Sequence, residues 1–108
     1  MNLTKKKCVP CEGGVPPIRG KELKRYLKEI KGWKAIKQHH LEKEYKFKNF
    51  MEALKFVNKV GALAEKEGHH PNIYFTWGKA KINLWTHAIN GLSENDFILA
   101  AKIDRLLN

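Results

Sequence analysis

Two histidines stand side by side in this 108-residue chain, at a point where a helix should end. His69 and His70 lie between Gly68 and Pro71. Gly68 is a natural helix end, and a residue that precedes a proline is restricted to extended backbone. Imidazole has an ordinary pKa of about 6.5, so both rings can give and take protons near neutral pH. The corner is therefore a candidate for general acid–base chemistry.

A predicted hairpin brings a third imidazole, His87, toward this corner. Gly78 suits the first central position of a two-residue turn over 78–79. With that turn, His70 and His87 lie opposite each other, with Cβ atoms roughly 5 Å apart. A turn one residue longer would instead oppose His69 and His87. Either register predicts a cluster of three histidines.

Two carboxylates are available to this cluster. Glu65 lies one helical turn before His69, where it can orient a ring or hold a substrate donor. Asp96 lies at the start of a predicted helix, so pairing with the helix dipole is a competing explanation for it. Three histidines can also bind zinc, and a purely structural role at a helix end and sheet edge is a further alternative. The other tandem pair, His39 and His40, has no helix end beside it, and we assign it structural or solvent-facing roles.

Cys8 and Cys11 form a C-x-x-C motif near the N-terminus. A zinc ribbon would need two further soft ligands, and the chain has no other cysteine. A thioredoxin-like motif would open a helix, whereas glycines and prolines follow here. We expect a structural role, while redox chemistry and a site completed by a second subunit or a distant histidine stay open.

The chain carries a formal net charge of +10, and residues 1–37 hold eleven Lys or Arg against three Glu. Such a charge attracts polyanions, but the basic residues are not interleaved with stacking aromatics as in nucleic-acid readers. A solvated face with a lysine-rich tail is the simpler explanation, so we expect no nucleic-acid partner. No apolar run approaches the roughly 20 residues of a membrane span, and the N-terminus does not resemble a secretory signal. We therefore expect no membrane partner and a cytoplasmic location.

The elements that position the histidines form one domain behind an arm. Residues 1–20, rich in glycine and proline, indicate an extended arm, and residues 21–108 a single domain. Apolar periodicity predicts helices over 21–31, 49–68 and from 93 onward, and strands over 33–37, 40–47, 73–77 and 80–86. The predicted buried stripe of the long helix is Phe50, Leu54, Val57, Gly61 and Ala64. The order α-β-β-α-β-β-α predicts a two-layer α+β fold, with helices on one face of a four-stranded antiparallel sheet.

The spacing of the candidate residues resembles the signature of the pterin-4a-carbinolamine dehydratases. The signature runs through Glu65, His69-His70-Pro71, Trp77, His87 and Asp96, with three, five, nine and eight residues between successive parts. The segments FKNF (47–50), AEKEGHHPN (64–72) and THAINGLSENDF (86–97) are similar to the family as well. CVPCEGGVPPI (8–18) resembles the arm of microbial members, so the likeness covers nearly the whole chain.

The resemblance implies a reaction and a set of roles. Family members remove water from a 4a-hydroxytetrahydropterin, giving the quinonoid dihydropterin that aromatic amino acid hydroxylases reuse. The pterin is the substrate, no metal or organic cofactor is implied, and a homodimer or homotetramer is expected. His69 and His87 would share the acid and base work, while His70 would position the carbinolamine. The substrate-binding residues implied are Glu65, Gly68, Pro71, Trp85, Thr86 and Asp96.

The chain departs from animal members of the family at four positions. They carry an acidic residue at Gly68, a serine at Trp85, a glutamate at Ala88 and an arginine at Asn95. These changes bear on specificity for the pterin side chain rather than on the reaction. We expect Trp77 in the core. The competing hypothesis is a non-catalytic binding protein, either a transcriptional coactivator and dimerisation cofactor or a nucleic-acid binder, and the complete histidine set favours catalysis.

Overall fold

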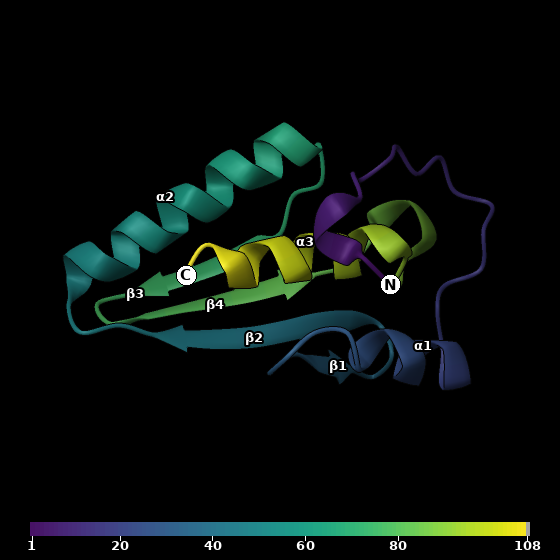
Figure 1. The fold of residues 1–108 in the computed structure, drawn as a ribbon, viewed down its shortest axis with the longest axis horizontal. Coiled ribbons are helices and arrows are strands. Elements are labelled where there is room, and N and C mark those ends of the chain that lie inside the picture. Colours follow the sequence, from purple (N-terminus) through teal and green to yellow (C-terminus); the bar gives the residue numbers. More distant parts are fainter. Residues whose placement is uncertain (108) are drawn as a thin grey trace.

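A computed structural model describes residues 1–107 of the chain. Its elements follow one another in the predicted order (Figure 1). The helices are α1 (Gly20–Leu27), α2 (Phe50–Glu67) and α3 (Glu94–Arg105), and the strands are β1 (Lys34–Ile36), β2 (His40–Lys46), β3 (Asn72–Thr76) and β4 (Lys79–Leu84). Two 3₁₀ turns, η1 (Leu3–Lys5) and η2 (His87–Ile89), are added to this order.

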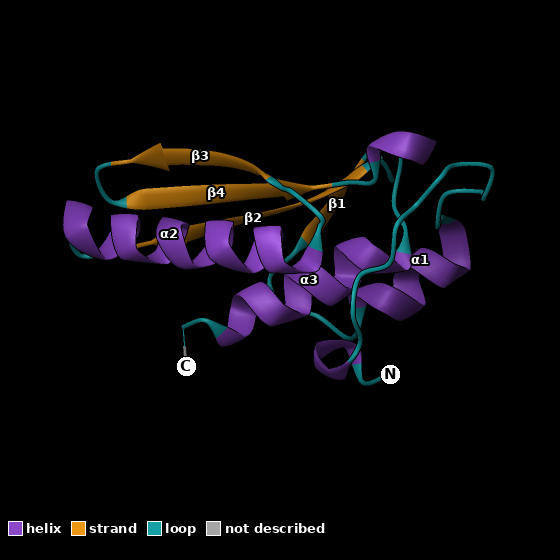
Figure 2. Cartoon of the chain, turned by 90° about the horizontal axis from the view of Figure 1, so that it is seen from above, coloured by secondary structure: helices purple, strands orange, loops and turns teal. Residues whose placement is uncertain are grey.

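The four strands form one antiparallel sheet in the order β1-β2-β4-β3. Figure 2 shows the three α-helices on the same side of this sheet, so the predicted two-layer α+β fold is confirmed. Successive side chains of a strand point to opposite faces, and on β4 Ala80, Ile82 and Leu84 are fully buried toward the helices. None of the helices in residues 1–107 is long and apolar enough to cross a membrane.

Helix α2 has the predicted ends but buries a different stripe. Its first turn is capped by the Asn49 side chain, which accepts the Glu52 N–H at 2.9 Å. The predicted stripe is wrong in its centre, because the buried residues are Ala53, Phe56, Val60 and Ala64, while Val57 is only partly buried against the core. Phe50 is 47% exposed and packs beside Phe75 at the sheet edge. The apolar arc of α2 is wide enough for both stripes, and the sheet receives the one whose alanines allow close approach.

The hairpin between β3 and β4 turns one residue earlier than predicted. Thr76 pairs with Lys79, so the two loop residues are Trp77 and Gly78 rather than 78 and 79. The Phe47 N–H donates to the Gly78 carbonyl at 2.8 Å, and a Cβ on Gly78 would lie 3.1 Å from the Phe47 oxygen. Glycine therefore fits the close approach of the turn to the end of β2, where a Cβ would make a tight contact. Trp77 lies at the hairpin tip with 65% of its surface exposed, so its expected place in the core is wrong.

The first 19 residues lie against the domain. Leu3 and Ile18 are buried in the core, and the Ile18 N–H donates to the Leu92 carbonyl at 2.8 Å. The segment contains the short turn η1 and otherwise no helix or strand. In Figure 1 it runs past α3 before reaching α1. The arm thus contributes to the same core as the sheet and the helices.

Candidate active site

The end of α2 forms the corner that carries the tandem histidines. Gly68 adopts the left-handed conformation, with φ of +67°, and reverses the chain after the last helical turn. The His69 N–H donates to the Ala64 carbonyl at 3.2 Å, which satisfies one of the last carbonyls of the helix. This closure, followed by Pro71, directs His69 and His70 to different partners.

His69 points inward to a buried carboxylate. Its Nε2 lies 2.6 Å from Asp96 Oδ1, and the Asp96 side chain is fully buried. The second oxygen of Asp96 accepts hydrogen bonds from Thr86 Oγ1 and from the Ser93 N–H, both at 2.9 Å. Asp96 therefore completes the capping box of α3 and at the same time holds the ring of His69.

His70 points outward to a second carboxylate. Its Nε2 lies 2.8 Å from Glu65 Oε1. The His70 side chain is 62% exposed and that of Glu65 is 82% exposed. Water screens such an exposed pair, so we expect it to stabilise the fold by about 0–1 kcal/mol, the range typical of surface ion pairs. The pair orients the ring without fixing it as firmly as Asp96 fixes His69.

His87 reaches the corner through a turn rather than through strand pairing. The β3–β4 ladder ends at Asn72 and Asn83, so neither predicted histidine pairing exists. The chain instead closes a loop in which the Thr86 N–H donates to the Gly91 carbonyl at 2.8 Å. Within that loop the exposed His87 ring stacks on Trp85, with centroids 4.4 Å apart.

The three histidines share one cavity of about 330 Å³. Of the other sequence candidates, Gly68, Trp85 and Thr86 also line it. Asp96 and Glu65 lie behind His69 and His70 as their hydrogen-bond partners, and Pro71 is outside the lining. The remaining lining residues are Val9, Pro10, Cys11, Ala88 and Asn95.

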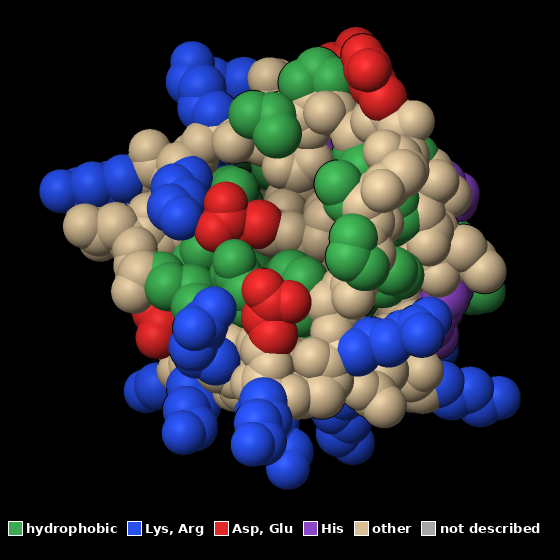
Figure 3. All heavy atoms as spheres, turned by 90° about the vertical axis from the view of Figure 1, so that its right-hand side faces the viewer, with side chains coloured by type: hydrophobic (Ala, Val, Ile, Leu, Met, Phe, Trp, Pro, Cys, Tyr) green, Lys and Arg blue, Asp and Glu red, His purple; other side chains and the backbone are tan. Residues whose placement is uncertain are grey.

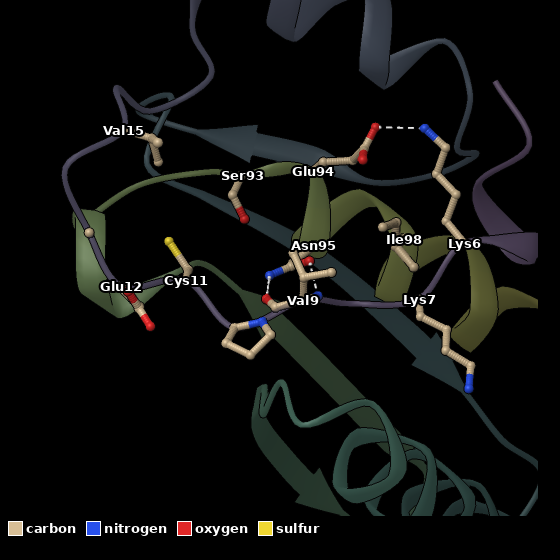
Figure 4. A pocket seen from close by; sticks show the side chains of 12 residues that line it. Lys6, Lys7, Val9, Cys11, Glu12, Val15, Ser93, Glu94, Asn95 and Ile98 are labelled. Carbon is tan, nitrogen blue, oxygen red and sulfur yellow. Dashed lines mark hydrogen bonds and ion pairs between the residues drawn. The ribbon is translucent and has the colours of Figure 1, made fainter.

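The arm is the part of this wall that the sequence did not indicate. Figure 4 shows the Asn95 side chain paired with the backbone of Val9. Its Oδ1 accepts the Val9 N–H at 3.0 Å, and its Nδ2 donates to the Val9 carbonyl at 2.7 Å. The Cys8 N–H also donates to Glu67 at 3.0 Å. Only the departure from the family's arginine at Asn95 could have drawn attention to this position.

A second cavity of about 540 Å³ shares part of this wall (Figure 4). The residues that line both cavities are Val9, Pro10, Cys11 and Asn95. Lys6 and Glu94, which also line the second cavity, form an ion pair at 2.9 Å. The segment from Val9 to Cys11, called the strap below, therefore contributes to two cavities.

A comparison with known families adds to this geometry. The family described as Pterin 4 alpha carbinolamine dehydratase matches residues 16–106. The chain belongs to this family. The resemblance inferred from the histidine spacing is thereby confirmed, and the family is one of hydro-lyases.

Relatives of this dehydratase-family chain match it along nearly its whole length, arm included. A protein of Alkaliphilus metalliredigens is 57% identical over 105 residues, which cover 96% of this chain and 95% of that protein. A protein of Rubrobacter xylanophilus is 55% identical over 104 residues, which cover 96% and 97%. Both carry the provisional name pterin-4-alpha-carbinolamine dehydratase.

Two solved structures share the dehydratase fold. A crystal structure described as a transcriptional coactivator/pterin dehydratase from Brucella melitensis matches with a TM-score of 0.80 and 27% identity, covering 85% of this chain and 99% of that one. A pterin dehydratase-like protein described as a RuBisCO assembly factor in the alpha-carboxysome matches with a TM-score of 0.55 and 31% identity, covering 62% and 77%. The descriptions of these two proteins name different roles.

The two cysteines differ in position, because Cys11 lines the histidine cavity and Cys8 does not. Burial, followed by the charge of Glu67, raises the pKa of the Cys8 thiol to about 12. Cys8 is therefore a neutral thiol near pH 7 and a poor nucleophile. Within residues 1–107, no group of three or more His, Cys, Asp or Glu side chains is arranged to hold a metal ion.

Proposed function

We propose that this chain dehydrates a 4a-hydroxytetrahydropterin to the quinonoid dihydropterin. The observation that carries the proposal is a cavity with three imidazoles in its wall, one of them backed by a fully buried carboxylate. Its volume of about 330 Å³ falls in the range of small-ligand sites. Membership of the dehydratase family supports the same substrate class.

The reaction asks for two proton transfers at adjacent atoms. The C4a–O bond and the N5–H bond break, and a C4a=N5 double bond forms. An acid gives a proton to the departing hydroxyl, and a base takes the proton from N5, so one water leaves and no electrons are exchanged. A positioned imidazole typically contributes about 10²–10⁴-fold to such a transfer.

The surroundings of the rings support a division of this work. Asp96 accepts a hydrogen bond from Nε2 of His69, which leaves Nδ1 as the free base, and its charge favours the imidazolium that forms. His87 is exposed and stacked on Trp85, so it exchanges protons with water and serves as the acid. His70, held only by Glu65, positions the carbinolamine.

The test is dehydration of chemically generated 4a-hydroxypterin by alanine variants of the three histidines. We expect losses of about 10²-fold or more for His69→Ala and His87→Ala, and a smaller loss for His70→Ala. Lys24→Ala, at an exposed position of α1 outside the cavity lining, is the control and should act like the parent protein. An unchanged rate in the His87 variant would contradict the proposed roles.

A non-catalytic binding role is the alternative, and two family structures are described with coactivator or assembly roles. A chain that leaves hydroxypterin decay unchanged but binds duplex DNA in a salt-dependent way would support it.

We also propose self-association as a homodimer or homotetramer, supported by the exposed apolar side chains of Phe50, Tyr74 and Trp77. Sedimentation velocity tests this proposal. The cytoplasmic location stays a prediction.

A further inference from the structure

The second tandem pair, His39 and His40, lies against the aromatic wall of the candidate site. The His39 and His40 rings are 5.4 Å and 6.0 Å from the Trp85 ring, measured between centroids. The same Trp85 ring stacks on His87 at 4.4 Å. Trp85 is therefore flanked by a proposed catalytic imidazole and by the pair that the sequence had assigned structural or solvent-facing roles.

His39 is also bonded to the loop that carries His87. Its Nε2 lies 2.9 Å from Asn90 Oδ1, and the Asn90 N–H donates to the His87 carbonyl at 3.1 Å. Asn90 is left-handed, with φ of +48°, a conformation that asparagine adopts more readily than most residues. The ring of His39 thus joins the β1–β2 turn to the end of η2.

The β1–β2 turn places His39 beside this loop. Lys37 and Gln38 have positive φ, +53° and +54°, and the His39 N–H donates to the Ile36 carbonyl at 2.9 Å, which is the two-residue turn that suits the twist of a hairpin. The Gln38 side chain accepts the Gly20 N–H at 2.9 Å, which ties the other side of the turn to the start of α1. The turn is therefore held from both sides.

The hydrogen-bond pattern determines what His39 can do. Asn90 Oδ1 only accepts, so Nε2 of His39 carries a hydrogen. The Nδ1 atoms of His39 and His40 are 3.0 Å apart, so one of them donates and the other accepts. With its hydrogen on Nε2, a neutral His39 ring accepts at Nδ1, so His40 is the donor between the two rings. The ring of His39 is thereby oriented by a hydrogen bond at each nitrogen.

We propose that His39 is a positioning residue that holds the His87 loop, and through it the His87 ring, over the cavity. The inference rests on the proposed dehydration, because it assigns His39 an effect on that reaction through His87. His39 does not line the cavity and so acts only through its neighbours.

Two single substitutions isolate the bond between His39 and Asn90. His39→Phe keeps an aromatic ring beside Trp85 and removes both ring nitrogens. Asn90→Gly keeps the left-handed backbone and removes the acceptor. Gln38→Ala is the matched control, because it loosens the same turn while leaving His39 bonded to Asn90.

The first readout is the proton NMR titration of the His87 ring, which needs no turnover. We expect His39→Phe and Asn90→Gly to shift the His87 resonance and its midpoint in the same direction, and Gln38→Ala to leave both unchanged. His87 signals that superimpose on those of the parent protein would overturn the inference. An equal shift in Gln38→Ala would overturn it as well, since general loosening of the turn would then be the cause.

The second readout is dehydration. We expect kcat to fall about tenfold in His39→Phe and in Asn90→Gly, with KM nearly unchanged. The reason is that a small misplacement of a reacting group lowers the rate rather than the affinity for substrate. The double variant should be no slower than either single variant, and additive losses would overturn the shared pathway. A parent protein without dehydratase activity would refute the proposed function, while the His87 titration would still decide whether His39 positions that ring.

Discussion

At the scale of single residues, the contact between His69 and Asp96 is central to the proposed chemistry. Asp96 has no exposed surface and receives hydrogen bonds from Thr86, from the Ser93 backbone and from His69. One carboxylate therefore caps α3, anchors the start of the His87 loop and orients a proposed base. A substitution of Asp96 should therefore change both the stability of the fold and the proposed reaction.

We predict that Asp96→Asn lowers the dehydration rate on the order of 10²-fold, because an amide cannot stabilise the imidazolium of His69. It should also destabilise the fold by about 1–3 kcal/mol, since a buried donor loses its acceptor. Urea unfolding and the dehydration rate measure the two effects. Ser93→Ala separates them, because it removes a cap worth about 1 kcal/mol but keeps the carboxylate. A fully active Asp96→Asn protein would contradict the role of the carboxylate.

Residue spacing predicted which imidazoles approach one another, but it could not predict how. Chain order places His69, His70 and His87 near one hairpin end, and the structure gathers them around one cavity. The partner of His70 is a short-range consequence of the end of α2, where sequence signals are strong, whereas Asp96, the partner of His69, lies 27 residues further along the chain. The contacts of Asn95 with Val9 join positions 86 residues apart, and no periodicity encodes such a pairing.

At the scale of elements, the C-terminal end of α2 and the arm across α3 shape the site. The Gly68 corner sets the direction of the tandem histidines, and the strap from Val9 to Cys11 forms the wall opposite them. Both features depend on local backbone conformation or on a few hydrogen bonds. Each can be altered by one substitution.

We predict opposite effects on stability for two glycine-to-alanine changes in α2. Gly68→Ala should cost about 1 kcal/mol, because its φ of +67° is unfavourable for a residue with a Cβ. Gly61→Ala should add about 0.5–1 kcal/mol, because Gly61 is helical and exposed and an added Cβ meets nothing within 4 Å. Thermal unfolding of both variants is the measurement. Destabilisation by Gly61→Ala would show that this face of α2 is covered in solution.

We predict that Asn95→Ala loosens the strap and weakens substrate binding more than it slows the chemistry. It removes both hydrogen bonds to Val9, so KM should rise several-fold while kcat changes less. Limited proteolysis within residues 5–12 should become faster. Lys6→Ala is the control, since it breaks an exposed ion pair of the same segment worth about 0–1 kcal/mol. Equal protease resistance in both variants would contradict the role of Asn95 in holding the strap.

The order and type of the elements could be predicted because apolar periodicity and turn residues are local signals. The register of the β3–β4 hairpin could not be predicted from the sequence, because the position of Gly78 depends on its contact with Phe47 at the end of β2. The buried face of α2 was ambiguous for a related reason. Phe50, Leu54 and Val57 form as regular a stripe as the buried residues do, and only packing against the sheet selects between them.

At the scale of the whole molecule, the chain carries a formal net charge of +10. On the face at the arm end, Figure 3 shows Lys and Arg side chains mainly along the left and lower margins, with apolar and acidic side chains toward the middle. Several acidic groups are paired with lysines, including Glu67 with Lys102 at 2.7 Å and Asp104 with Lys43 at 2.8 Å. The expectation of no nucleic-acid partner stays a prediction.

We predict that the protein loses stability as pH rises from about 9 to about 12. Burial first, then neighbouring acidic groups, raise the pKa of Cys8 from 9.0 and of Tyr26 from 10.0, each to about 12. Burial and the bond to Asp104 raise that of Tyr45 as well. The unfolded chain then holds fewer protons than the folded one, so the free energy of unfolding falls with pH.

Urea midpoints measured between pH 8 and 11 check this dependence. Cys8→Ala should flatten the curve, because it removes one of the groups that must stay protonated. A midpoint that stays constant up to pH 11 would contradict the burial of these groups as the structure shows it.

The strap has a consequence for how the protein is made. Val9 is synthesised 86 residues before Asn95, the residue that holds it. Lys6 and its partner Glu94 are separated by 88 residues. Contacts of such separation close late, because they follow the ordering of the chain between them. One wall of the site is therefore synthesised long before the residue that holds it, and it is among the last parts to settle.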